Sequence, residues 1–177
     1  MQNVNKDTLV ARLLRERDTF EQLLNRVGYA RRMTLKGVAG KWSIKDILAH
    51  IWANEQYLAD RMHEILHNQP YTPSKTHTAL DAFLDEFGYP DFGSPLLDDD
   101  YPNEWIIEKY RNISLDDIVA QELQAFSSIL SAFKNMDSEL IVHHNLHNRI
   151  IKHTYEHYHE HMHEIKHWLK TNGIQLK

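Results

Sequence analysis

Histidines cluster near the end of this chain, and histidine both binds transition metals and transfers protons near neutral pH. The stretch "KHTYEHYHEHMHEIKHW", residues 152–168, holds six of the chain's 13 histidines. On a helix, a rotation of 100° per residue places His161 inside the apolar sector and His157 at its edge. His153 falls somewhat further out. The remaining histidines face water beside glutamates: His159, His163 and His167. His157 and His161 are one helical turn apart, so they can share a metal ion.

A third candidate ligand lies on an earlier amphipathic segment. His50 stands just off the apolar face of the stretch "WSIKDILAHIWANEQYL", in line with Asn54, Tyr57 and Arg61. A stripe of these polar side chains suits a site that orients a substrate or stabilises developing negative charge, and Tyr57 is also a candidate general acid. The structural alternative is a boundary histidine bonded to the backbone, with Asn54 and Arg61 as interhelical contacts and Tyr57 as packing.

The composition limits what such a site can contain. The chain has no cysteine, so imidazole and carboxylate must supply any metal ligands. Three neutral imidazoles leave an open coordination position, which is typical of catalytic rather than structural metals. Nickel, zinc, copper and ferrous iron all accept nitrogen ligands. Asp46 and Glu164 each lie one turn from a histidine. They are candidates for orienting His50 and His161 by bonding the ring nitrogen that does not bind the metal.

Helical periodicity predicts the elements that position these residues. Apolar residues recur at three- and four-residue steps over about 5–27, 43–67, 114–133 and 145–171. Asn5, Ser43 and Ser114 are suitable N-caps, and Asp46 stands in the capping-box position after Ser43. The predicted apolar stripe of the third segment includes Val119 and Leu123. The last segment is expected to stop at the "NG" pair after residue 171.

The fold class expected is all-α, an up-down-up-down four-helix bundle in a single domain over 1–177. An insert of about 68–113 separates helices 2 and 3, and its stretches "TALDAFLDEFG" and "NEWIIEKYR" predict short helices. It is rich in aromatic residues, so it is interpreted as a cap over one end of the bundle or as a pocket wall.

Charge and hydropathy indicate the kinds of partner and the cell compartment to expect. A net charge of -5 argues against a nucleic-acid partner. There is no apolar run of membrane-spanning length and no signal-peptide pattern. A cytoplasmic protein is expected.

The runs "GKWSIKDILAHIWANEQYL" and "HTYEHYHEHMHEI" resemble the two metal-binding motifs of the DinB-like superfamily, and the wording of the second is closest to its ClbS/DfsB branch. The resemblance spans nearly the whole chain. It maps His50, His157 and His161 onto the superfamily's three metal-binding histidines. It implies a divalent metal, nickel or zinc first and iron as an alternative, and a homodimer.

For function, the resemblance implies a metal-dependent hydrolase or thiol transferase acting on a small electrophilic molecule, with a low-molecular-weight thiol as a candidate partner. Two alternatives stay open. One is a metal-independent protective protein of the ClbS type, which is linked to cyclopropane hydrolysis of a genotoxic metabolite. The other is a bundle that binds metal without catalysis, through its exposed histidines.

Overall fold

A computed structural model describes residues 5–28, 30–68 and 100–176, and within these ranges every helix or strand assigned is a helix. The all-α prediction is therefore confirmed for the described chain. The long elements are α1 (Lys6–Val27), α3 (Ile44–His67), α6 (Leu115–Asn135) and α9 (His157–Thr171). Shorter ones are α2 (Ala30–Met33), α5 (Asp100–Tyr110), α7 (Ser138–His143), α8 (Leu146–Ile151) and the π-helix η1 (Lys152–Glu156).

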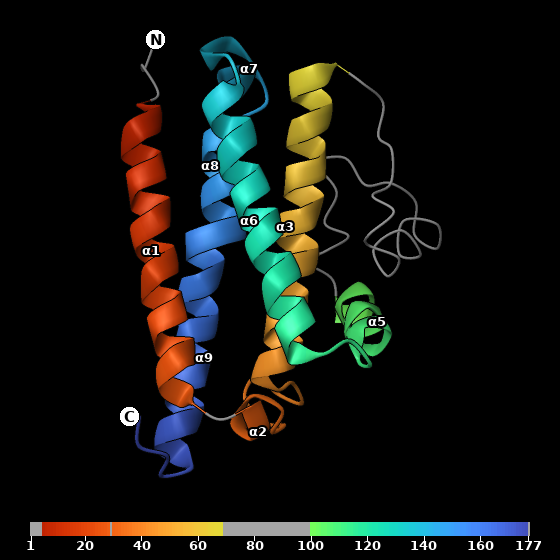
Figure 1. The fold of residues 1–177 in the computed structure, drawn as a ribbon, viewed down its shortest axis with the longest axis vertical. Coiled ribbons are helices and arrows are strands. Elements are labelled where there is room, and N and C mark those ends of the chain that lie inside the picture. Colours follow the sequence, from red (N-terminus) through yellow and green to blue (C-terminus); the bar gives the residue numbers. More distant parts are fainter. Residues whose placement is uncertain (1–4, 29, 69–99, 177) are drawn as a thin grey trace.

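The long helices lie side by side along the molecule's long axis, and α5 lies outside them beside α3 (Figure 1). α3 packs along α6, and α1 packs against α9. Large side chains fill the space between these helices, with Phe20, Trp52, Phe133 and Tyr158 at most 2% exposed. No helix in the described chain is long and apolar enough to cross a membrane.

The predicted helix starts are confirmed by their caps. The Asn5 side chain accepts a hydrogen bond from the Thr8 backbone N–H at 3.1 Å. Ser43 and Asp46 form the expected capping box at the start of α3. The Ser114 hydroxyl accepts from the backbone N–H at residue 117, at 3.0 Å. These bonds satisfy backbone donors that a helix start leaves unpaired. The cap at Ser43 therefore fixes where α3 begins, and with it the position of His50 along the helix.

Two predictions about the apolar faces need correction. Val119 and Leu123 are 40% and 46% exposed, so they do not belong to the core. The inward position on α6 is occupied instead by Glu122, which is 1% exposed. Because neighbours on a helix are 100° apart, an inward Glu122 turns Leu123 toward solvent.

The last predicted helix is not uniform. Instead of one α-helix over 145–171, the chain forms α8, then η1 (Lys152–Glu156), then α9. α9 ends at Thr171, as the following Asn-Gly pair predicts. π-turns are rare and recur at functional sites, and this one ends directly before His157.

The insert is described only in its last part. Of its two predicted helices, "NEWIIEKYR" falls largely within α5, which is confirmed. The stretch "TALDAFLDEFG" lies outside the described residues. Trp105 is partly buried and Tyr110 is 2% exposed, with the Tyr110 ring stacked on Trp52 at 4.4 Å between centroids. This stacking attaches α5 to α3.

The centre of the core contains four polar side chains, one from each long helix. We call Arg17, Glu55, Glu122 and Tyr158 the buried quartet; none is more than 5% exposed. Both terminal nitrogens of Arg17 donate to the Glu122 carboxylate. The Tyr158 hydroxyl donates to Glu55, and Arg17 contacts the same hydroxyl at 3.2 Å. The quartet therefore joins all four helices at one level.

The quartet has a definite charge pattern. Burial and the nearby Glu122 charge raise the pKa of Glu55 well above its ordinary range. Burial also raises the pKa of Glu122, against the opposing effect of Arg17. No donor in the described chain reaches Oε2 of Glu55. The arrangement thus favours a proton on Glu55 and a single compensated pair, Arg17 with Glu122.

Replacing Glu55 with glutamine is expected to flatten the dependence of stability on pH. Above the unfolded pKa of 4.5, the folded wild-type protein keeps a proton that the unfolded chain releases. Its stability therefore falls as the pH rises toward the raised folded pKa. The variant has no such proton and should gain up to about 1.4 kcal/mol relative to wild type per pH unit in that window.

Urea unfolding at a series of pH values measures this difference. Glu21→Gln is the matched control, because Glu21 is a partly exposed glutamate at the edge of the quartet that bonds Arg17 at 2.7 Å. A gain for Glu55→Gln that does not change with pH would contradict the raised pKa.

Candidate metal centre

Three histidines from two helices converge at one point. His50 Nε2 of α3 lies 2.8 Å from His157 Nε2 of α9, and His161 Nε2 lies 3.0 Å from the same atom. One nitrogen from each of the three falls within 4.8 Å of the other two. His50 and His161 are 8% and 7% exposed, and His157 is partly buried. The sequence-predicted ligands are therefore brought together; we call them the histidine triad.

The other ring nitrogens explain why the Nε2 atoms face inward. His50 Nδ1 lies 2.9 Å from Asn103 Oδ1, and His161 Nδ1 lies 2.7 Å from Glu164 Oε2. Amide and carboxylate oxygens only accept hydrogen bonds, so each contact holds a proton on Nδ1. The Nε2 lone pairs of both rings are then directed at the centre, which is the usual arrangement of metal-binding histidine.

The electrostatics of the triad also suit a cation. Burial, followed by the neighbouring His50 and His161, lowers the pKa of His157 well below its ordinary value. Its imidazole is thus held in the neutral form that binds metals. Nitrogens that share a tetrahedral zinc ion lie about 3.3 Å apart, so small side-chain shifts suffice to admit an ion. The donor set fits a divalent transition metal.

The two predicted supporting carboxylates behave differently. Glu164 bonds His161 as expected. Asp46 does not orient His50: its carboxylate accepts bonds from the Ser43 N–H and hydroxyl and from Lys36. The capping role uses this side chain at the helix start, and Asn103 of α5 supports His50 instead. Asn103 was not identified from the sequence, because periodicity within the insert says nothing about where α5 docks.

A small polar pocket of about 190 Å³ opens beside the triad. Its lining is shared by α3, α5, η1 and α9, and consists of His50, Asn54, Asn103, Lys152, His153, Glu156, His157 and Glu160. The η1 turn, which ends directly before the first α9 ligand, contributes three of these side chains.

The three predicted catalytic residues lie at different depths. Asn54 lines the pocket and donates to the His50 carbonyl at 3.0 Å. Tyr57, one turn further along α3, is 6% exposed. Arg61, two turns beyond Asn54, donates to Glu64 at 2.7 Å. Tyr57 and Arg61 are not among the described residues that line this pocket.

Three of the other histidines in the last segment face solvent, and His153 lines the pocket without joining the triad. His159, His163 and His167 are exposed, as predicted. His159 lies 2.8 Å from Glu16 of α1, in an exposed contact. The density of histidine in this segment therefore does not define the site; only His157 and His161 contribute to the triad.

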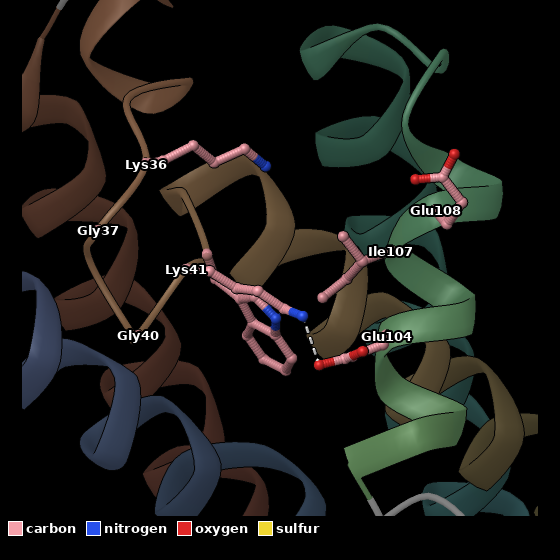
Figure 2. Close-up of a pocket in the computed structure, with 8 residues that line it drawn as sticks. Lys36, Gly37, Gly40, Lys41, Glu104, Ile107 and Glu108 are labelled. Carbon is pink, nitrogen blue, oxygen red and sulfur yellow. Dashed lines mark ion pairs between the residues drawn. The ribbon is translucent and has the colours of Figure 1, made fainter.

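A larger, open cleft lies between the loop at residues 36–42 and α5 (Figure 2). It encloses about 730 Å³, and Trp42 forms part of its wall. The Lys41–Glu104 ion pair spans it at 2.6 Å. The Trp42 ring also contacts the His50 ring, at 5.2 Å between centroids. Trp42 thus contacts a member of the triad and also lines the cleft.

Comparisons with protein-family models, with curated proteins and with solved structures find no match for this chain.

Proposed function

We propose that this protein is a metal-dependent enzyme, a hydrolase or thiol transferase, that acts on a small electrophilic molecule. The observation that carries the proposal is the convergence of the three Nε2 atoms of His50, His157 and His161 beside an open pocket. Three neutral nitrogen ligands with space next to them suit a catalytic metal better than a structural one. Nickel or zinc is the proposed ion, with iron as an alternative.

The side chains around the ion have separable tasks. A divalent ion, when bound, supplies a Lewis acid that makes water or a thiol more acidic. Asn103 and Glu164 hold the two supporting rings in their binding tautomer. Asn54 is placed to orient a substrate in the pocket. Tyr57 and Arg61 lie further along α3 and are proposed to contact the part of the substrate that extends in that direction.

We also propose the finer fold and family assignment that the sequence motifs imply. The packing of α1, α3, α6 and α9 supports an up-down-up-down four-helix bundle of the DinB-like type. Relation to the ClbS/DfsB branch, a homodimer and a low-molecular-weight thiol as co-substrate belong to the same proposal. They rest on the motifs around His50 and His157.

Metal analysis tests the proposal. Untagged protein, stripped with a chelator and reconstituted, is expected to hold one nickel or zinc ion per chain. A variant with alanine at the three exposed positions, His159, His163 and His167, is the matched control and should hold the same amount. A wild-type protein that holds no ion, or an ion lost with the exposed histidines, would contradict the proposed centre.

A metal-independent ligand-binding protein is the second candidate, and the cleft of about 730 Å³ beside Trp42 favours it. The tryptophan and Ile107 supply apolar surface, and the lysines and glutamates of the wall supply charge. Turnover or tight ligand binding that survives in chelated protein would favour this candidate over the first.

A further inference from the structure

Two side-chain contacts join α3 to α9, and on α9 they come from the adjacent residues His157 and Tyr158. Their partners on α3 are His50 and Glu55. Neighbours on a helix are separated by 1.5 Å along the axis and 100° around it. The same stretch of α9 therefore reaches α3 twice: through His157 to His50 in the pocket, and through Tyr158 to Glu55 in the core.

The contact between the histidines does little by itself to hold α9 against α3. Acceptor oxygens hold the Nδ1 protons of His50 and His161, so both Nε2 atoms present lone pairs to His157 Nε2. His157 has one Nε2, which can donate to only one of the two. Without an ion, at least one of the two short nitrogen contacts is therefore unsupported by a proton.

The contact between Tyr158 and Glu55, by contrast, holds α9 firmly against α3. Tyr158 is fully buried, its ring is stacked on Phe20 at 5.0 Å with an interplanar angle of 2°, and its hydroxyl donates to Glu55. Arg17 contacts that hydroxyl at 3.2 Å and is itself held by Glu122. Ring and hydroxyl are both fixed, so the position of α9 against α3 is set without help from the histidines.

We propose that the buried quartet is a positioning device that gathers the histidine triad before a metal ion arrives. Preorganised ligands bind more tightly because less ordering is needed on binding. The inference rests on the proposed metal centre and assigns Tyr158 and Glu55 a role in its affinity. Neither residue touches the ion or substrate; both act through the placement of His157 and His161.

Cobalt(II) binding by Tyr158→Phe provides the main test, because the visible spectrum of cobalt reports ligand geometry as well as occupancy. Loss of the hydroxyl is expected to weaken cobalt binding by about 10- to 100-fold, the range typical of lost supporting contacts, and to alter the spectrum. Tyr155→Phe is the matched control. Tyr155 is also buried and lies one turn earlier, and its ring lies under Arg12 of α1.

Substitutions of Glu55 separate positioning from general packing. Glutamine retains an oxygen that accepts from the Tyr158 hydroxyl, so Glu55→Gln should keep wild-type cobalt affinity and spectrum. Leucine has similar bulk and no acceptor, so Glu55→Leu should reproduce the loss seen with Tyr158→Phe. A role limited to filling the core would instead leave both variants with wild-type cobalt affinity and spectrum.

A measurement on the wild-type protein avoids any variant that fails to fold. In metal-free protein, nuclear Overhauser contacts between the His50 and His157 rings are expected. Rings that meet only after metal is added, or a Tyr158→Phe variant with wild-type affinity and spectrum, would overturn the inference while leaving the metal centre intact. Wild-type protein that binds no cobalt would overturn the centre itself, and the inference with it.

Discussion

Replacing His50 with alanine is expected to eliminate tight metal binding. His50 is the single triad member from α3, so its loss leaves only the two α9 histidines, one turn apart. We expect affinity for zinc or nickel to fall by more than about 100-fold, beyond the range caused by losing a supporting contact. Turnover that depends on the metal should disappear with it. Isothermal titration and metal analysis of the chelated, refilled protein measure the effect.

The control for this variant is His153→Ala. His153 lines the same pocket but is not part of the triad. It should retain the ion, and added metal should raise the thermal midpoint of His153→Ala and wild type but not of His50→Ala. Equal metal content in His50→Ala and wild type would show that the inward histidines are structural.

Replacing Arg17 with methionine is expected to destabilise the protein strongly. Methionine fills similar space but leaves the Glu122 carboxylate buried without the guanidinium that now donates to both of its oxygens. Breaking a buried ion pair in this way typically costs about 3–5 kcal/mol. Urea unfolding at neutral pH measures the loss of stability.

A double variant shows whether the loss of stability comes from the Glu122 charge that is left buried without its partner. Arg17→Met with Glu122→Gln removes both charges, and should recover much of the stability, since replacing both partners of a buried pair is often nearly neutral. A double variant as unstable as Arg17→Met alone would instead assign the loss to the contacts of the Arg17 guanidinium with the Phe126 and Tyr158 rings.

The helices and their starts could be predicted because the signals are local. Ser43 and Asp46 determine the start of α3 by bonding backbone groups within three residues. The sequence also contains a signal for the quartet. Arg17 stands at the heptad-like spacing between Leu13 and Phe20, as Glu55 does between Ile51 and Leu58. A charge in such a position must find a buried partner, but sequence spacing does not say which helix supplies it.

The triad could be predicted for a similar reason, and its support only in part. His157 and His161 are sorted by helical rotation alone, and Glu164 lies on the same helix as His161. Asn103 comes from α5, more than 50 residues from His50, so its contact depends on tertiary docking. Asp46 was assigned the wrong role because the capping bond to Ser43 competed for the same carboxylate.

The π-turn at Lys152–Glu156 takes up one residue without changing the direction in which α9 presents its histidines. Such a turn holds one residue more than an α-helical turn, so its residues cover about the same rotation as an α-helical segment that is one residue shorter. Loss of one of them would let the segment wind as a regular α-helix and would leave His157 on the same side of α9. Loss of a residue between His157 and His161 would instead rotate one ligand away from the other by roughly 100°. The centre therefore tolerates a change of chain length before its first α9 ligand but not between its two α9 ligands.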